Sequence, residues 1–562
     1  MNQMDMNENS TSRTPIGKTS SPERQPNSTS KFYCWLKEGV VVNPFDFLVV
    51  EHIKDTKSIG IVSEMTSPSD ALSHLANYVS SGFGEPLEEP YVSRLKSTVA
   101  EITVLRNTGY VEADGREVEV SMPLPSDRLV YFADSTDIQK AIGVDRIKGE
   151  SIPAGIIVQS NGLTVPVSLD SDYLLGPEGA HINASGISGL ATKTSYLMFL
   201  LMAIYQRMQD KVAIIIFNVK QADLLHIHEG AEQETLTRRD EEIYKLLGLR
   251  TEPLQNVKYF LPRGPGGTEP DSDDPPSEFS LYAYELADVH SRFDLLFADV
   301  PDPYFTLDTF NSRVREDWAN GRLVIGTRTP VRRGAGVATV VNWTDMRNVD
   351  NQLLVEAYNL HPTTPPRIKR ELTRLTSSPL FVNNRGKNEI YLGKEVKRIS
   401  PGDIFVIDIN RVPTRTQPFV VGDVMRSIDE LYRYEEPASI PTKLIVLIDE
   451  LNSFAPSGST SAITEQIVEI ARKGRSRGTI LFCAQQFKSE VHDQITGNCG
   501  THAIGRTGAA EVRKRAYTFL DEKSKQNIMG LGQGDIVLST PTWRSPIKIA
   551  FPKPAYRKIE RR

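Results

Sequence analysis

The chain has 562 residues, of which 39% are hydrophobic and 24% charged, a composition typical of a globular protein with sizeable cores. Its 65 Lys and Arg against 71 Asp and Glu leave a net charge of −6, which excludes nucleic-acid binding by bulk charge. Any DNA contact must therefore come from a local basic face or from a pore made by several subunits. Three scattered cysteines do not form a disulfide framework, and no run approaches the roughly 20 apolar residues of a membrane helix. We expect a cytoplasmic protein with no membrane partner.

The first 170 residues divide into two segments. Residues 1–30 are rich in Ser, Thr, Asn, Pro and charge, and we expect a disordered tail because so little apolar surface cannot offset the ordering entropy. Residues 31–170 contain one helical pattern, at 69–81, among short β-type runs that predict a small N-terminal β-barrel. These runs lie at 47–53, 59–62, 100–104, 129–132, 155–158 and 164–167.

An α/β pattern begins after residue 170. A strand at 180–184, a Gly-rich turn, an apolar helix at 194–209 and a strand at 212–219 form a βαβ unit, which predicts a parallel sheet covered on both faces. We expect residues 171–250 and 401–545 to be two parts of this core, with residues 251–400 a mostly helical insertion and 546–562 a C-terminal tail. The second part is predicted to contain a strand at 404–409, a helix at 420–434, a strand at 443–448, a helix at 462–473 and a strand at 479–484.

The turn between the first strand and helix of this core has the character of a phosphate-binding loop. Glycines let backbone N–H groups converge on phosphate oxygens, and the helix N-terminus adds free donors and a positive dipole end. Lys193 is predicted to neutralise the β- and γ-phosphates, and the Thr194 hydroxyl to bind Mg²⁺. The predicted nucleotide-binding residues are Gly186, Ser188, Gly189, Ala191, Thr192, Lys193, Thr194 and Ser195.

This loop departs from the usual pattern. Thr192 stands where a Gly normally precedes the lysine, and Gly189 lies one place further out than expected. The loop is therefore one residue longer or closes differently, and a Gly-rich turn that binds no ligand is the alternative for this motif taken alone.

A second motif supports a nucleotide site. An apolar strand at 444–448 ends in Asp449 and Glu450, and carboxylates at the tip of a buried strand are costly unless a metal or partner meets them. Parallel α/β sheets bind ligands at this edge. Asp449 is predicted to hold Mg²⁺ through water and Glu450 to polarise the attacking water, with a helix-capping Asp as the alternative. The two motifs together predict an ATPase with ATP and Mg²⁺ as its cofactors.

Residues 35–555 resemble the HerA family of the FtsK/HerA group of hexameric ATPases. The resemblance rests on Asp449-Glu450 with the following Phe454-Ala-Pro456, on the run from Arg472 to Gly478 followed by a strand and Gln485-Gln486, and on Gly532-Gln-Gly534-Asp535. It implies a RecA-like core behind an N-terminal barrel, a homohexameric ring with ATP at the interfaces, translocation on double-stranded DNA, and a partner effector enzyme.

The resemblance also implies roles for polar residues outside the two motifs. Gln486, or Gln485 if the register slips by one, would sense the γ-phosphate at a strand tip. Arg506 is the first choice, and Arg475 the second, for an arginine acting on the neighbouring subunit's nucleotide, and a surface salt bridge is the alternative for both. Lys220 and Asp223 are placed to support the site.

Two functions remain open. The first is a DNA-translocating, helicase-like motor serving a nuclease or another effector in DNA processing or bacterial anti-phage defence. The second is a nucleotide-regulated ring scaffold that assembles and activates an effector, such as a nuclease or a sirtuin-like NAD hydrolase, without translocating. A P-loop kinase acting on a small molecule is a third reading that lacks a substrate-lid signature.

Overall fold

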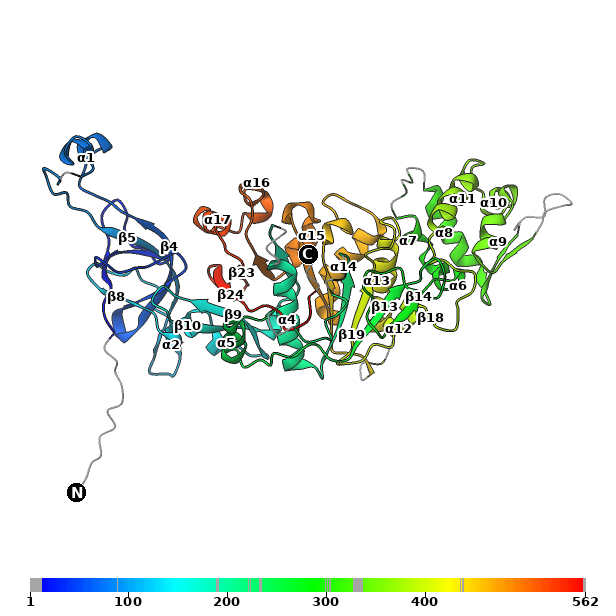
Figure 1. Ribbon diagram of the computed structural model, residues 1–562, viewed down its shortest axis with the longest axis horizontal. Helices are drawn as coiled ribbons and strands as arrows, with labels where there is room; N and C mark the ends of the chain where they lie inside the picture. Colours follow the sequence, from blue (N-terminus) through cyan, green and yellow to red (C-terminus); the bar gives the residue numbers. More distant parts are fainter. Residues whose placement is uncertain are drawn as a thin grey trace, which may run out of the picture. The chain divides into compact units, whose positions relative to one another are not determined.

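The computed structural model describes residues 13–558 except for 88, 188–191, 221, 223, 232–234, 299, 301, 303–304, 327–336, 435 and 437–438. Its contacts divide the chain into two units (Figure 1). The first unit comprises Met1–Asp170 and Thr518–Phe551, and the second comprises Ser171–Tyr517 and Pro552–Arg562.

The first unit contains the expected barrel. Six strands close on themselves in the order β1-β2-β5-β4-β3-β8 around a core that includes Phe32, Leu48 and Ile102. Helix α1 (His74–Ser80) confirms the one helical pattern predicted between these strands. The barrel strands are β1 (Gly17–Ser20), β2 (Lys31–Leu36), β3 (Phe47–Glu51), β4 (Lys57–Thr66), β5 (Thr98–Asn107) and β8 (Leu129–Phe132).

Strand β1 corrects the expectation of a disordered segment over residues 1–30, of which 1–12 lie outside the described residues. It pairs antiparallel with both β2 and β8 and so closes the barrel. Thr19 is buried, and its hydroxyl donates to the Pro125 carbonyl at 2.7 Å. A Cβ on Gly17 would lie 2.0 Å from the Trp35 carbonyl oxygen, so only glycine permits this approach. The apolar pattern of the sequence does not indicate this strand, because backbone pairing holds it in place more than apolar content does.

The first unit also contains antiparallel strands in the order β10-β9-β24-β23. The runs predicted near 155–158 and 164–167 form β9 and β10 of this sheet and are not barrel strands. The expected tail 546–562 likewise begins with a strand, β24, because that strand pairs with β23 and β9. The four strands are β9 (Ser151–Val158), β10 (Thr164–Asp170), β23 (Asp535–Ser539) and β24 (Ile547–Ala550).

The second unit is built on a parallel sheet in the order β22-β11-β21-β20-β12-β19-β13-β14-β18. Its central strands are apolar throughout because helices cover the sheet. β21 lies between β11 and β20, so the strand before the phosphate loop and the strand before the acid pair are not neighbours. The strands are β11 (Ile182–Ser185), β12 (Val212–Asn218), β13 (Val257–Pro262), β14 (Ser280–Tyr282), β18 (Glu389–Ile390), β19 (Ile404–Asp408), β20 (Lys443–Ile448), β21 (Thr479–Gln485) and β22 (Thr501–Ile504).

The longer helices of this core are α4 (Thr192–Met208), α5 (Arg238–Leu246), α13 (Gln417–Tyr434) and α14 (Ala462–Arg477), and the short ones are α3 (Ser171–Leu174), α15 (Asp493–Asn498) and α16 (Ala509–Val512). The strands and helices predicted for the core are confirmed, with bounds that shift by a few residues. This arrangement is an α/β, RecA-like P-loop ATPase fold, because it is a parallel sheet in which one strand separates the loop strand from the acid strand.

The region expected to be a mostly helical insertion, 251–400, is more mixed. Strands β13, β14 and β18 extend the core sheet, and a small antiparallel sheet β15-β16-β17 lies among the helices. One hydrophobic core joins Phe217 and Val446 of the central strands to Phe293 and Trp343 of this region. The further elements are α6 (Leu286–Val289), α7 (Phe293–Leu296), α8 (Thr306–Asp317), β15 (Trp318–Ala319), β16 (Arg322–Ile325), β17 (Ala338–Val340), α9 (Trp343–Asn348), α10 (Asn351–Tyr358), α11 (Thr364–Leu375) and α12 (Leu392–Val396).

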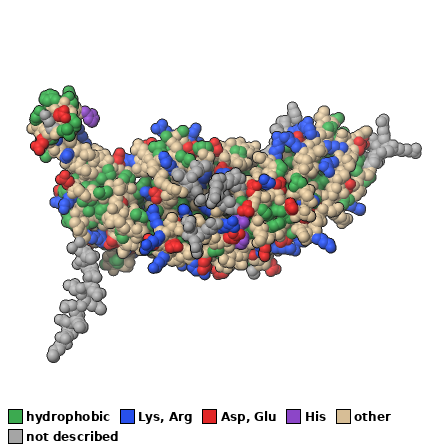
Figure 2. Space-filling model, in the orientation of Figure 1, with side chains coloured by type: hydrophobic (Ala, Val, Ile, Leu, Met, Phe, Trp, Pro, Cys, Tyr) green, Lys and Arg blue, Asp and Glu red, His purple; other side chains and the backbone are tan. Residues whose placement is uncertain are grey.

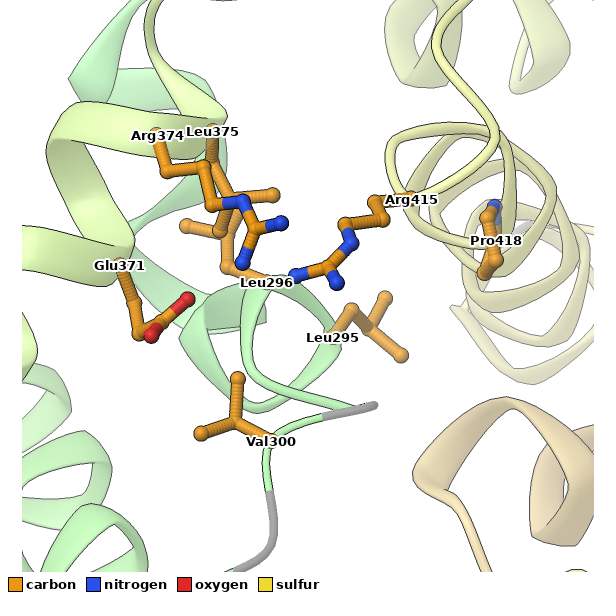
Figure 3. A pocket seen from close by; sticks show the side chains of 8 residues that line it. All are labelled: Leu295, Leu296, Val300, Glu371, Arg374, Leu375, Arg415 and Pro418. Atoms are coloured by element: carbon orange, nitrogen blue, oxygen red, sulfur yellow. The ribbon is translucent and has the colours of Figure 1, made fainter.

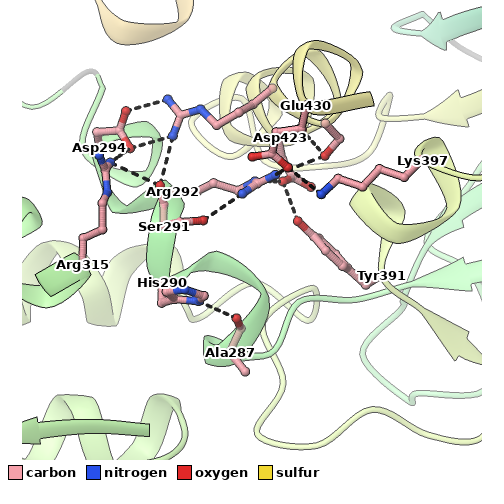
Figure 4. A network of polar contacts seen from close by, with 12 residues as sticks. Ala287, His290, Ser291, Arg292, Asp294, Arg315, Tyr391, Lys397, Asp423 and Glu430 are labelled. Carbon is pink, nitrogen blue, oxygen red and sulfur yellow. Dashed lines mark hydrogen bonds and ion pairs between the residues drawn. The ribbon is translucent and has the colours of Figure 1, made fainter. Parts of the chain in front are cut away.

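A buried ion pair fixes helix α13 to this region (Figure 4). Arg292 donates to Asp423 at 2.5 Å and to Glu430 at 3.1 Å. The Tyr391 hydroxyl donates to Asp423 at 2.9 Å, and Lys397 pairs with Glu430 at 2.6 Å. Burial raises the pKa of Asp423, and the Arg292 charge opposes that rise. The network holds together elements that come from three separate stretches of the chain.

Candidate nucleotide site

The predicted phosphate loop begins at the carboxyl end of β11. Gly186 has φ 150°, and a Cβ there would lie 3.2 Å from the Arg506 carbonyl oxygen. The Ile187 N–H donates to that same oxygen at 2.8 Å, so the start of the loop is held against the residues after β22. The predicted positions Ser188, Gly189 and Ala191, and the side chain of Thr192, lie outside the described part of the chain.

Lys193 and Thr194 lie in the first turn of α4. Lys193 is 6% exposed, and its Nζ has no hydrogen-bond partner among the described residues. Burial lowers the pKa of Lys193, while the charges of Asp449 and Glu450 oppose the shift. Thr194 donates through Oγ1 to Asp449 Oδ2 at 3.0 Å. A buried ammonium without a partner is satisfied when a phosphate oxygen arrives, so this lysine fits the predicted ligand.

The acid pair lies at the carboxyl end of β20. Asp449 is buried, and its Oδ1 accepts from the Glu450 N–H at 2.9 Å. Glu450 has φ 53°, a left-handed conformation that costs a non-glycine residue roughly 1–2 kcal/mol. The Glu450 carboxylate is ion-paired with Lys220, which follows β12. The Thr194 hydroxyl and the Asp449 carboxylate are hard oxygen donors of the kind that suits Mg²⁺.

The two candidate glutamines differ in their surroundings. Gln485 is the last residue of β21, is fully buried, and donates from Nε2 to Asn183 Oδ1 of β11 at 2.9 Å. Gln486 follows it directly and is half-buried, at the edge between the loop strand and the acid strand. Its position suits contact with a phosphate better than that of Gln485, and its role stays a prediction.

The two candidate arginines lie at opposite edges of the sheet. Arg506 follows β22 at the carboxyl edge, beside the phosphate loop, and its side chain is exposed. Arg475 lies in the last turn of α14 and donates to the Glu178 carbonyl at 3.2 Å, before β11 begins and so at the amino edge. The structure therefore favours Arg506 as the residue near a nucleotide, although action on a neighbouring subunit stays a prediction for both.

One contact of this site had no signal in the sequence. Lys558 donates from Nζ to the Ser195 hydroxyl at 2.6 Å, in the first turn of α4. The two residues are 363 positions apart, and Lys558 lies in a segment expected to be a tail. Asp223, expected to support the site together with Lys220, lies outside the described residues.

A cavity among α7, α11 and the start of α13 does not compete with this site (Figure 3). Its volume is about 180 Å³, below the roughly 300–1,000 Å³ of pockets for organic ligands. It contains none of the predicted site residues. Its lining consists of Leu295, Leu296, Val300, Glu371, Arg374, Leu375, Arg415 and Pro418.

Comparison with known proteins finds distant similarity. No family model matches the chain. A stretch of 193 residues is 25% identical to the DNA double-strand break repair helicase HerA of Pyrococcus furiosus. The match covers 28% of this chain and 34% of the archaeal protein, so it spans about a third of that protein's length.

Solved structures resemble this chain over more of its length but at lower sequence identity. The bacterial conjugative coupling protein TrwBdeltaN70 is 13% identical, with 76% of this chain and 95% of that chain covered and a TM-score of 0.46. VirB4 of Thermoanaerobacter pseudethanolicus is 12% identical, with 72% and 96% covered and a TM-score of 0.42. The fold assignment rests on the strand order of the chain itself. Among the described residues, no helix has the length and apolar character needed to cross a bilayer.

Proposed function

We propose that this chain binds ATP with Mg²⁺ and hydrolyses it. The observation that carries the proposal is the 3.0 Å hydrogen bond between Thr194 and Asp449, because it joins the two predicted motifs, 255 residues apart, at one edge of the sheet. Lys193 lies beside this contact with an unsatisfied buried ammonium. These are the parts needed to hold a nucleoside triphosphate and its metal ion.

The proposed chemistry assigns one role to each side chain. Lys193 neutralises the β- and γ-phosphate oxygens, and the Thr194 and Asp449 oxygens hold Mg²⁺, which supplies further charge neutralisation. Glu450 orients a water molecule that attacks the γ-phosphorus as the bond to the ADP oxygen breaks, giving ADP and phosphate. Glu450 must leave its ion pair with Lys220 to do so, and Gln486 and Arg506 would contact the γ-phosphate, the arginine from a neighbouring subunit.

We further propose that the ATPase works as a hexameric, helicase-like translocase on double-stranded DNA. The relative that it matches is a DNA double-strand break repair helicase. A local basic face is also present, since Figure 2 shows Lys and Arg side chains gathered around α11. Arg370 and Arg374 of that helix are exposed, as phosphate contacts require. We place the motor in the reducing cytoplasm, because the cysteines are buried and free.

The same site supports a second candidate, a ring scaffold that uses nucleotide to assemble and to activate an effector enzyme. The Lys220–Glu450 ion pair favours it, because it occupies the carboxylate that hydrolysis needs. For either candidate we propose a partner effector, a nuclease or a sirtuin-like NAD hydrolase, and a role in anti-phage defence.

The deciding experiment is ATP hydrolysis by the purified chain with and without duplex DNA, at low and at moderate salt. We expect DNA to stimulate turnover, and salt to remove the stimulation because phosphate contacts release counterions. Lys193→Ala should lose nucleotide binding, and Glu450→Gln should bind ATP without turning it over. Turnover that DNA leaves unchanged supports the scaffold, and nucleotide binding that survives Lys193→Ala refutes the assigned site.

A further inference from the structure

The segment 552–558, which we call the strap, is docked on the second unit. Figure 1 shows the chain after β24 running past α4. The Arg557 N–H donates to the Glu229 carbonyl at 2.9 Å, and the Arg557 guanidinium pairs with the Glu229 carboxylate at 2.7 Å. Tyr556 forms an isolated antiparallel bridge with Gly230 and is buried. Backbone and side chain therefore both hold the strap.

The strap is also anchored on α5. The Tyr244 hydroxyl donates to the Lys553 carbonyl at 2.9 Å, and the Lys553 N–H donates to Asp240 at 3.0 Å. Ala555 is 1% exposed. These contacts fix the path of the chain up to Lys558.

The Glu229 carboxylate, which holds Arg557 of the strap, stays charged near neutral pH. Glu229 accepts from Arg557 and also from His226 at 2.9 Å. The Arg557 and His226 hydrogen bonds lower the pKa of Glu229 to about 2. Residues 226–230, which hold the strap, follow β12 and Lys220 in the chain.

Lys558 extends from this anchor to the first turn of α4, where its Nζ donates to Ser195 Oγ at 2.6 Å. A cation beside a helix N-terminus faces the positive end of the helix dipole, and a bound anion offsets that repulsion. Lys193 adds a second ammonium to the same turn. Two ammonium groups and a helix N-terminus together favour a bound anion with more than one charge.

We propose that Lys558 is a nucleotide-positioning residue that donates to the phosphate chain of a nucleoside di- or triphosphate. This inference rests on the proposed ATP site. Lys193 and Ser195 are two residues apart, about 200° around the helix axis at 3.6 residues per turn. Lys558 therefore approaches the phosphates from a different side than Lys193, and the proposal places its contact on the oxygens nearer the nucleoside. A contact there is shared by ADP and ATP, so Lys558 contributes alike to both, whereas Lys193 contributes more to ATP.

The test measures the affinity of the full chain for fluorescent ADP and for a non-hydrolysable ATP analogue by titration. We expect Lys558→Ala to weaken both ligands by about tenfold, the order of one charge-assisted hydrogen bond. Lys558→Arg should retain most of the affinity. Lys553→Ala is the matched control on the same strap, because its Nζ bonds the Thr235 carbonyl and its backbone anchor persists.

A second measurement separates positioning from simple docking of the strap. Hydrogen exchange in 552–558 should slow when ADP binds to the unchanged chain, and should not respond to ADP in Lys558→Ala. Normal affinity for both nucleotides in Lys558→Ala, with binding lost in Lys193→Ala, overturns the inference and leaves the proposed function standing. Unchanged binding in both variants overturns both.

Discussion

Replacing Arg292 by Met should loosen the attachment of α13. Arg292 is 4% exposed and Asp423 is 0% exposed, so the substitution leaves a buried carboxylate without its cation. Breaking a buried pair in this way costs about 3–5 kcal/mol. Asp423 keeps the Tyr391 hydrogen bond, and burial already raises its pKa, so it can take up a proton and limit the loss. We therefore expect a cost near the lower end, about 3 kcal/mol.

The cost is best read from native-state hydrogen exchange, because one unfolding midpoint is not a defined quantity for a chain of two units. About 3 kcal/mol corresponds to a little over a hundredfold faster exchange of the α13 amides. The control is Arg433→Met, since the Arg433–Asp429 pair at 2.7 Å lies on the same helix with an exposed arginine side chain. We expect no measurable change there.

A double variant tests the cause. Arg292→Met combined with Asp423→Leu replaces both charges by apolar groups, and such replacements are often neutral or stabilising. Exchange should return toward that of the unchanged chain. The reasoning is refuted if the single variant leaves α13 unaffected, or if the double variant exchanges as fast as the single one.

Three further outcomes follow from the contacts described. Gly186→Ala should weaken nucleotide binding at least tenfold, because the φ of 150° and a Cβ 3.2 Å from a carbonyl oxygen would strain the loop. The control is Gly508→Ala, where a Cβ meets no described atom within 4 Å, and this variant should bind nucleotide normally in the same titration. Thr194→Val should lower ATPase turnover by about a hundredfold or more, because the hydroxyl that holds Mg²⁺ and donates to Asp449 is gone. Excess Mg²⁺ should not restore the turnover. Turnover within twofold of normal would show that Thr194 has no role in the site. Burial lowers the pKa of Lys488 to about 8 from 10.5, so the stability of the second unit, followed by a probe within that unit, should rise between pH 8 and 10.5. Lys488→Met should abolish that rise, and a rise of the same size in the variant would contradict the reasoning.

The sequence predicts helices and strands that have a clear local pattern, but it does not predict which strands pair or which polar stretches form strands. Both ends of β20 are predicted correctly, because an apolar run between Lys443 and the acid pair indicates a buried strand of that length. β9 and β10 are recognised as strands but assigned to the wrong sheet, since a strand pattern does not name its partners. β1 is missed because its four residues lie in a polar stretch.

The candidate site likewise contains residues that the sequence predicts and residues that only the structure reveals. Lys193, Thr194, Asp449 and Glu450 belong to motifs in which spacing carries the meaning, and the chain brings them to one edge of the sheet. Lys558 carries no motif, and only the path of the strap shows that it reaches Ser195. The ion pair of Lys220 with Glu450 likewise depends on which strands lie side by side.

The position of β11 in the sheet constrains the order in which this chain can fold during synthesis. Both neighbours of β11, which are β21 and β22, come from residues after Gly478. Until these residues leave the ribosome, β11 has two unpaired edges, and the phosphate loop lacks the backbone oxygen that holds its start. At roughly 5–20 residues per second the delay is on the order of tens of seconds. Exposed strand edges attract other chains, so aggregation of the nascent protein competes with folding during that interval, and the phosphate loop takes its final shape only at the end of it.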